Sequence, residues 1–205
     1  MDVLLGKGWF TRLVHVNHVK SQEQVSSDIV TKIKSSPVFQ PGVGRVEKHT
    51  ASLDLKQDYR PKFCKARTVA YAEKERVGKE LDRLESSGYI EKVNHSEWAS
   101  PIVMVNKSDG SLRVCGDYKR TLNPSLDMKV YPLPNVEDCF VAMKGGVLFS
   151  KIDIKQAYNS LPLRDDDQIL TTINTHHGLY KFNVLPYGVN SASAIFQSKI
   201  GRAHV

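Results

Sequence analysis

The stretch Phe149-Ser150-Lys151-Ile152-Asp153-Ile154 places a carboxylate within an apolar run. Residues 147–154 alternate like a strand whose two faces differ, and Asp153 lies near the end of that strand. A carboxylate in so apolar a strand is costly to bury unless it is paired or binds a metal ion. The pattern therefore predicts a functional role for Asp153, and a carboxylate that caps the following helix is the structural alternative.

A second extended region lies upstream and has the pattern of a β-hairpin. Residues 101–105 are apolar and largely β-branched, and residues 112–115 form another short strand-like run. Asp109-Gly110 between them is a common turn sequence. Lys107 and Arg113 therefore flank the tip of a predicted hairpin. The structural alternative is that Lys107 and Arg113 are two solvated charges on a surface loop.

Helical periodicity is clearest over residues 73–87. Val77, Leu81 and Leu84 recur at helical spacing and share one face. Gly88 is a natural stop directly after it. Further helices are predicted over residues 135–144, capped by Asn135, and from about residue 191.

The remaining patterned regions predict strands and turns. Residues 169–175 and 179–185 indicate a hairpin with His176-His177-Gly178 as its turn rather than as a metal site. Residues 51–55 alternate like a strand. Asp165-Asp166-Asp167 is expected to be a solvated loop, because three consecutive carboxylates cannot converge on one ion from a strand or a helix.

Composition bounds the class of protein. The 205 residues are 40% hydrophobic and 25% charged, which is typical of a globular chain rather than a disordered one. Lys plus Arg exceeds Asp plus Glu by 29 − 22 = 7, which favours a polyanionic partner such as nucleic acid, with a merely basic surface as the alternative. Cys64, Cys115 and Cys139 are widely spaced and predict reduced thiols. We expect no transmembrane helix and no secretory signal.

The region from Tyr59 to Ser198 resembles the reverse transcriptase of gypsy-type LTR retrotransposons. The resemblance rests on several motifs in the family's order. They are Lys65-Ala66-Arg67, residues 81–88, 98–103, 107–119 and 131–134, Phe149 to Tyr158, and Leu185 to Val189. It implies an α+β fold, the right-hand polymerase fold, in which residues 59–199 form the fingers and an incomplete palm.

The flanking segments are interpreted through the same resemblance. Leu4 to Phe10 is similar to the end of the retropepsin-type protease that precedes reverse transcriptase in the polyprotein, so residues 1–58 are expected to be a protease tail and linker. Residues 22–34 within it have the spacing of a short amphipathic helix. Residues 200–205 depart from the family and match a translated sequencing adapter, so we expect a non-native read-through tail.

The resemblance also implies a reaction and a site. The family extends a primer by nucleotidyl transfer on an RNA or DNA template, with two Mg²⁺ ions (Mn²⁺ is the alternative) held by carboxylates. Asp153 matches the family's first catalytic, metal-binding aspartate. The expected nucleotide-binding residues are Lys107, Arg113, Gln156, Ala157, Tyr158 and Tyr187, and the expected nucleic-acid-binding residues are Asp117, Tyr118, Lys119, Pro186 and Gly188.

These residues have different implied roles. Arg113 and Lys107 would hold the α- and γ-phosphates, and backbone N–H groups of Gln156 and Ala157 would hold the triphosphate where a strand turns into a helix. Tyr158 would lie under the incoming sugar, with a core tyrosine as its structural alternative.

The implied partners are an RNA or DNA template-primer, deoxynucleoside triphosphates and the rest of the polyprotein (protease, RNase H and integrase), without a membrane. The expected location is a cytoplasmic virus-like particle and the nucleus. The family's later Asp-Asp motif is expected beyond Val205, so this chain alone is expected to be inactive. The alternative function is a catalytically dead or co-opted relic that binds nucleic acid.

Overall fold

The computed structural model describes residues 13–18, 35, 44–46, 49–107, 110–128, 131, 135–146, 150–154 and 156–200. For residues 13–18, 150–153 and 200 it describes the backbone alone. Strands and helices are mixed along the chain, so the expected α+β class is confirmed.

A five-stranded sheet organises most of the described chain, with strand order β2-β7-β6-β3-β4. β3 and β4 form the predicted antiparallel hairpin, with Asn106 opposite Leu112 at its tip. β3 also pairs in parallel with β6, where Ser100 lies opposite Ile173. The strands are β2 (Ile90–Val93), β3 (Ser100–Asn106), β4 (Leu112–Gly116), β6 (Ile173–Thr175) and β7 (Gly178–Phe182).

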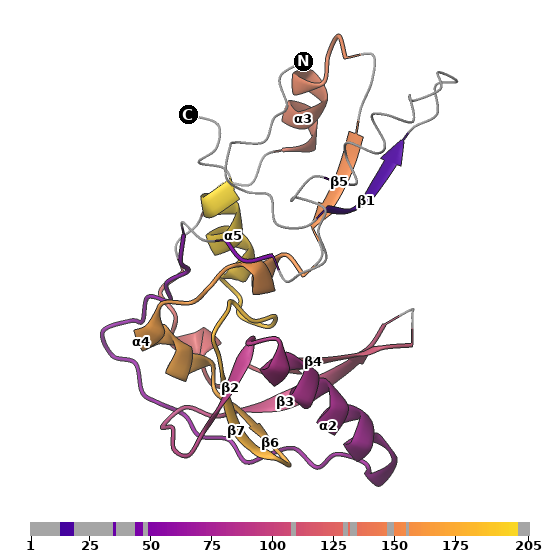
Figure 1. Cartoon of the computed structure of the whole chain (residues 1–205). Coiled ribbons are helices and arrows are strands. Elements are labelled where there is room, and N and C mark those ends of the chain that lie inside the picture. Colours follow the sequence, from indigo (N-terminus) through magenta and orange to yellow (C-terminus); the bar gives the residue numbers. More distant parts are fainter. Residues whose placement is uncertain are drawn as a thin grey trace.

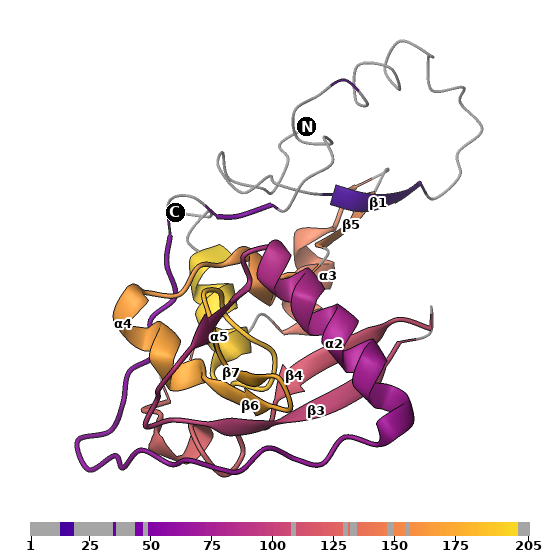
Figure 2. The same ribbon diagram turned by 60° about the horizontal axis from the view of Figure 1, so that its bottom comes forward.

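Helix α2 (Tyr71–Ser86) lies across one face of this sheet (Figures 1 and 2). Val77, Leu81 and Leu84 are buried, which confirms the predicted face. Gly88 adopts a φ of 68° directly after the helix, a conformation that favours glycine. Its carbonyl oxygen accepts a hydrogen bond of 2.8 Å from Arg45 Nη2.

Tyr118 is the largest fully buried side chain of the core, and its hydroxyl donates a hydrogen bond of 2.9 Å to the carbonyl oxygen of Thr171. Gly116 leaves the room that its ring occupies, because a Cβ at position 116 would overlap that ring. Gly188, with a φ of 101°, packs against the carbonyl oxygen of Gly116. Two glycines therefore let a loop and a strand close over one tyrosine.

A second part of the molecule lies at the end opposite the five-stranded sheet (Figure 1). Strand β1 (Leu13–His18) pairs antiparallel with β5 (Ser150–Ile154), in a ladder separate from the main sheet. Helix α3 (Val136–Ala142) has no buried residue, and the side-chain oxygen of Asn135 caps it by accepting from Val136 N at 2.8 Å. Helix α5 (Ala192–Ile200) lies between this part and the sheet.

The hairpin, α2, α3, α5 and the histidine turn were predicted correctly. The predicted strand over 169–175 is partly wrong, because Ile169–Thr171 forms a 3₁₀ turn (η4) and β6 begins at Ile173. Thr171 and Thr172 hydroxyls donate 2.6 Å bonds to the carbonyl oxygens of Gln168 and Ile169, and such local bonds compete with a strand ladder.

Residues 51–55 form no strand of a sheet. Ala51 and Leu55 make isolated bridges to Leu163 and Leu126, and Leu53 between them is buried. The alternating pattern of residues 51–55 therefore identifies the buried side chains correctly, although the segment forms no strand of a sheet. The helix expected over 22–34 lies outside the described residues, and β1 was not predicted.

The expectation of a solvated loop at 165–167 is wrong in its conformation, which is helical, and its expected solvation is wrong for Asp167. Residues 165–168 form α4 (Asp165–Gln168), in which Asp165 and Asp166 are exposed and Asp167 is 4% exposed. Asp167 accepts 2.9 Å bonds from the backbone N–H of Leu53 and from Arg164 Nη2. These two donors compensate the desolvation of the buried carboxylate.

Cys64, Cys115 and Cys139 are free thiols, as predicted. Among the described residues, no helix combines the length and apolar character that crossing a membrane requires.

Candidate functional site

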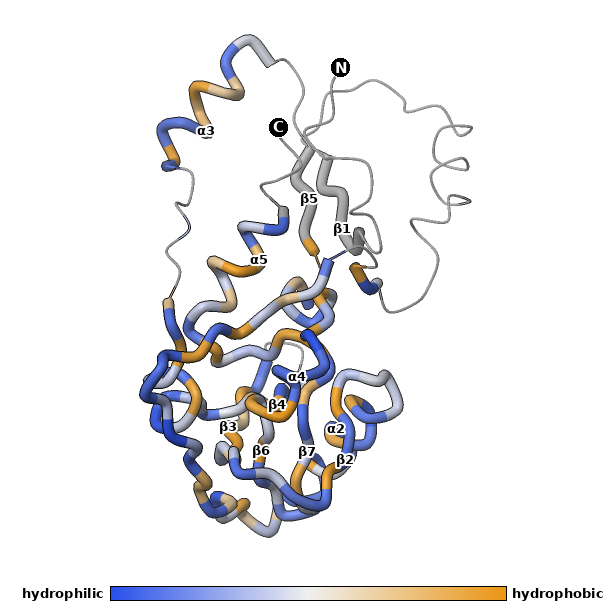
Figure 3. Tube along the Cα trace, turned by 90° about the vertical axis from the view of Figure 1, so that its left-hand side faces the viewer, coloured by the Kyte–Doolittle hydropathy of each residue, from blue (hydrophilic) through white to orange (hydrophobic). Residues whose placement is uncertain are grey.

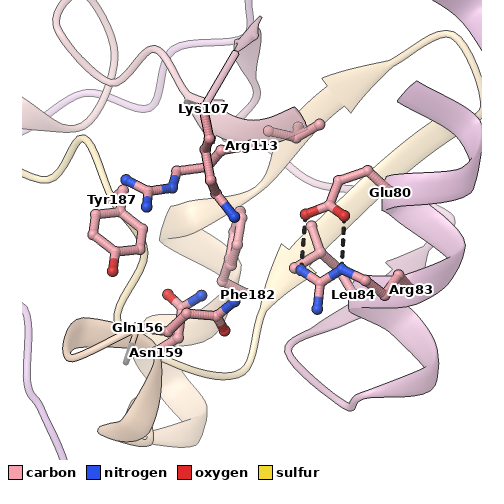
Figure 4. A pocket seen from close by; sticks show the side chains of 10 residues that line it. Glu80, Arg83, Leu84, Lys107, Arg113, Gln156, Asn159, Phe182 and Tyr187 are labelled. Carbon is pink, nitrogen blue, oxygen red and sulfur yellow. Dashed lines mark hydrogen bonds and ion pairs between the residues drawn. The ribbon is translucent and has the colours of Figure 1, made fainter. Parts of the chain in front are cut away.

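A pocket of about 360 Å³, including its open mouth, lies between α2, the β3–β4 hairpin and the segment after β5 (Figure 4). Its walls come from segments that are far apart in the sequence. The lining residues are Glu80, Arg83, Leu84, Lys107, Arg113, Val114, Gln156, Asn159, Phe182 and Tyr187.

Lys107 and Arg113 reach the pocket from the tip of the hairpin. The tip is fixed by a 2.9 Å bond from Lys107 N to the carbonyl oxygen of Ser111 and a 3.0 Å bond from Gly110 N to that of Lys107. Figure 4 shows the Lys107 amine pointing into the cavity. Within the described residues neither side chain forms an ion pair, so both charges are available to an anion.

Tyr187 lies beside Arg113, on the same side of the pocket. The guanidinium carbon of Arg113 lies 4.6 Å from the centre of the Tyr187 ring, which is the geometry of a cation–π contact. Burial raises the pKa of the Tyr187 hydroxyl, although the charge of Arg113 opposes that rise. Tyr187 therefore stays neutral at ordinary pH and presents a ring that Arg113 holds in place.

Tyr158 extends the aromatic cluster behind the pocket. Its ring lies 5.2 Å from that of Tyr187 and 5.6 Å from that of Phe196, the second in an edge-to-face arrangement. It is half-buried, so the structure brings it beside the predicted nucleotide-binding residues without making it a lining residue of the pocket.

The floor of the pocket follows the end of β5. Gln156 has a φ of 54°, an uncommon conformation for a residue other than glycine and one that clusters at functional sites. Ala157 follows it and precedes a 3₁₀ turn of three residues, Tyr158–Ser160. The helix expected after the strand is therefore too short to supply a macrodipole, and the N–H groups of Gln156 and Ala157 would act without one.

Asn159 was missed by the sequence analysis. It is 6% exposed and lines the pocket, and its Oδ1 is buried without a hydrogen-bond partner in the described part of the chain. Burying a hydrogen-bond acceptor without a donor costs folding free energy, so such an unpaired group is unusual in a folded protein. The sequence carries no signal for it, because burial of one asparagine depends on the surrounding fold.

Glu80 and Arg83 were also missed, and they form the far wall of the pocket. Arg83 Nε and Nη2 donate 2.6 Å and 2.8 Å bonds to the two carboxylate oxygens of Glu80. These bonds raise the pKa of Arg83. The spacing of the two residues on a predicted helix indicated the pair, but not that it faces a cavity.

Asp153 lies in β5 between Ile152, opposite Val16, and Ile154, opposite Leu13. Its side chain is outside what the structure describes. The strand places its backbone three positions before Gln156 and thus near the floor of the pocket. No group of three or more His, Cys, Asp or Glu residues among those described could hold a metal ion.

The residues expected to contact nucleic acid occupy different environments. Asp117 accepts a 2.8 Å bond from Arg67 Nη2 and is partly exposed, and Lys119 is exposed. The Tyr118 side chain is 1% exposed, so it supports the core and does not reach a template itself. Pro186 is buried and Gly188 exposed, on the loop that carries Tyr187.

Asn123, in the 3₁₀ turn Asn123–Ser125, attaches that loop to the segment that follows β4. Its Nδ2 donates a 3.0 Å bond to the carbonyl oxygen of Gly188, and its Oδ1 accepts a 3.0 Å bond from the backbone N–H of Asn190. The amide therefore uses both of its ends to hold the loop beside the hairpin.

The arrangement is suited to an anionic ligand with a flat apolar part. Two available cations lie on one wall, an aromatic ring lies beside them, and a buried amide oxygen lies on the floor. A guanidinium and an ammonium together match phosphate oxygens.

Comparison with known proteins agrees with this chemistry. Residues 46–203 match the family model described as reverse transcriptase (RNA-dependent DNA polymerase). The chain is 38% identical over 186 residues to the uncharacterized protein K02A2.6 of Caenorhabditis elegans, covering 89% of this chain and 15% of that protein. It is 35% identical over 99 residues to the transposon Tf2-3 polyprotein of Schizosaccharomyces pombe, covering 48% of this chain and 7% of the polyprotein. The chain thus spans a small part of the length of these relatives.

Two solved structures share the fold. The foamy viral protease-reverse transcriptase in complex with double-stranded DNA matches with a TM-score of 0.61 and 20% identity, over 78% of this chain and 27% of that one. The prototype foamy virus protease-reverse transcriptase matches with a TM-score of 0.66 and 17% identity, over 90% of this chain and 25% of that one. The fold is therefore the right-hand polymerase fold, as expected. With more than half of its length matched by the family model, this chain belongs to the reverse transcriptase (RNA-dependent DNA polymerase) family.

Proposed function

We propose that this chain forms the fingers and the first part of the palm of an RNA-directed DNA polymerase encoded by an LTR retrotransposon, which extends a primer by nucleotidyl transfer. One observation carries the proposal. Lys107, Arg113, Gln156 and Tyr187, four residues expected to bind the nucleotide, line one pocket directly after the strand that carries Asp153.

In this proposal the described residues bind and orient a deoxynucleoside triphosphate. Lys107 and Arg113 hold the phosphates, and the backbone bonds of Lys107 with Ser111 and Gly110 join the two strands that carry these cations. Tyr187, held by Arg113, and Tyr158 behind it form the aromatic side against which the sugar packs.

A divalent metal ion, Mg²⁺ or Mn²⁺, is the proposed cofactor. Asp153 supplies a hard oxygen ligand of the kind that Mg²⁺ prefers. When bound, the metal would stabilise charge on the attacking and leaving oxygens. One carboxylate does not complete such a site, so the proposal places the remaining ligands in the palm that follows in the polyprotein.

Primer extension on a homopolymer template with Mg²⁺ or Mn²⁺ tests the proposal. The proteins are this chain, a version extended through palm and thumb, and the extended version carrying Asp153→Asn or Asp138→Asn. Asp138 is an exposed carboxylate of α3 and serves as the matched control. We expect activity from the extended protein and its Asp138→Asn variant, none from this chain, and a loss of roughly a hundredfold or more with Asp153→Asn.

Each arm has its own contradicting result. Extension by the 205-residue chain would contradict the argument from incomplete ligands. Full activity of the Asp153→Asn protein would contradict the assignment of Asp153. An inactive extended protein that still binds nucleic acid would favour the alternative, a co-opted binding relic.

A further inference from the structure

Strand β1 comes from a part of the sequence that was expected to be a protease tail and linker, yet it pairs with the strand that carries Asp153. It lies outside residues 46–203, the range that the reverse transcriptase family model matches. Among the described residues β5 pairs with no other strand, and the ladder is separate from the five-stranded sheet (Figure 1). In the described part of the chain, β5 therefore takes its pairing from a segment far upstream in the sequence.

The register of this ladder matches residue types across the two strands. Apolar residues lie opposite apolar residues, and polar residues lie opposite polar ones. The pairs are Leu13 with Ile154, Val16 with Ile152, Asn17 with Lys151, and His18 with Ser150. A slip of one residue in either direction would set Val16 against Asp153 or Lys151, because the faces of a strand alternate with a period of two. The two sequences are therefore complementary in the observed register.

The ladder is irregular at Asp153. Between the pairs formed by Leu13 and Val16 the register shifts, because β1 has two residues where β5 has one. The extra residue makes a β-bulge, in which Val14 and His15 lie opposite Asp153. Without the bulge, Leu13 and Val16 would fall on opposite faces, since they are an odd number of positions apart. Bulges bend a strand, increase its twist and are frequent beside active sites.

We propose that β1 is an integral strand of the palm that positions the backbone of Asp153, so that the polymerase unit includes residues from Leu13 onward. Backbone N–H and C=O groups of a strand need partners, and in the described chain those of β5 find them in β1. A linker that merely rested on β5 would not need complementary residue types or a bulge at one position. β1 is thus a positioning segment, and it acts on the reaction only through Asp153.

The inference rests on the proposed function for the role of Asp153, whereas the pairing of β1 with β5 is a property of the chain by itself. It has a consequence for the processing of a polyprotein. A cut between β1 and residue 46 would separate β5 from its partner strand. A cut before Leu13 would leave the ladder intact.

Hydrogen exchange followed by mass spectrometry tests the pairing on the 205-residue chain, without nucleotide, metal or activity. Val16→Pro combined with Asn17→Pro removes two successive N–H groups, and one of them faces β5, because successive residues of a strand direct these groups to opposite sides. We expect amide exchange of residues 150–154 to become roughly tenfold faster or more, while that of α2 keeps its rate. Val16→Ile combined with Asn17→Thr is the matched control and should change neither rate, since both substitutes favour strands.

The version extended through palm and thumb tests the effect on Asp153. The proline pair should lower kcat roughly tenfold or more, because a small displacement of a catalytic group is costly. KM for the deoxynucleotide should stay within about twofold, because Lys107, Arg113 and Tyr187 line the pocket from other segments. The control pair should leave both constants unchanged.

Fast exchange of residues 150–154 in the unaltered chain would overturn the inference, as would unchanged exchange in the proline variant. Equal acceleration in α2 would contradict a local role, and a rise in kcat would show that β1 blocks the site. An inactive extended protein whose β5 exchange still depends on β1 would contradict the proposed function alone. An active one in which exchange and kcat ignore the proline pair would contradict this inference alone.

Discussion

Helices α2 and α3 both carry apolar side chains, but those of α2 are buried and those of α3 are exposed. α2 buries Val77, Leu81 and Leu84 against the sheet. α3 leaves Phe140 and Val141 65% and 71% exposed and buries no residue (Figure 3). The sheet part therefore covers the apolar face of α2, whereas among the described residues nothing covers the apolar side chains of α3. The comparison shows that periodicity predicts a helix and its apolar face, but not whether this chain covers that face.

The largest expected effect comes from removing a buried side chain of α2. Leu81 is 0% exposed, so Leu81→Ala should lower the free energy of unfolding by about 2–5 kcal/mol, through lost burial and the cavity it leaves. Phe140→Ala on α3 should change it by about 0.5 kcal/mol or less. Urea unfolding followed by circular dichroism measures both. Similar losses in the two variants would contradict the contrast between the helices.

An intermediate effect is expected at the glycines. Gly116→Ala should cost about 1–3 kcal/mol, because its Cβ would overlap the fully buried Tyr118 ring. Gly145, after α3, has a φ of 84°, and among the described residues no neighbouring atom lies within 4 Å of the position that a Cβ would take, so Gly145→Ala should cost only the backbone term of about 1 kcal/mol. Thermal or urea midpoints of the two variants give the difference. A larger loss at position 145 would show that α3 packs more tightly than described.

The smallest expected effect is a pH dependence that belongs to the sheet part. Burial, and then the neighbouring His177 at a ring distance of 4.2 Å, lower the pKa of His176 from 6.5. A hydrogen bond with the backbone of Lys74 opposes this lowering of the pKa, and the charge of Lys74 adds to it. The unfolded chain therefore binds more protons than the folded one as pH falls below about 6.5, so stability should rise with pH through that range. His176→Gln should flatten this slope in urea midpoints measured from pH 5 to 7. An unchanged slope would assign the dependence to other groups.

Much of the secondary structure was predictable from sequence because its signals are local. The Asp109-Gly110 turn, the spacing of Val77, Leu81 and Leu84, and the Asn135 cap each act within a few residues. The strand over 169–172 was mispredicted because threonine hydroxyls bind nearby carbonyl groups instead. Burial of Asp167 depends on Leu53, more than a hundred residues away, and leaves no local pattern.

In the candidate site too, some residues were predictable from sequence motifs and others are explained only by the tertiary fold. Lys107, Arg113, Gln156 and Tyr187 were selected through motifs and meet in one pocket. Glu80, Arg83 and Asn159 reach that pocket because helix α2 and the turn after β5 face each other, which is a property of the tertiary fold. The role of Asp153 stays a prediction, as do the domain limits at residues 58 and 200.

The Asn123 amide ties the aromatic side of the pocket to the segment that follows β4. It bonds the loop of Tyr187 through Gly188 and Asn190, and Arg113 lies against the Tyr187 ring. The segment of Gln156 is joined to the same loop where Leu185 N donates a 2.9 Å bond to the carbonyl oxygen of Leu161. Both sides of the pocket therefore depend on one loop for their relative position, although Asn123 itself does not line the pocket.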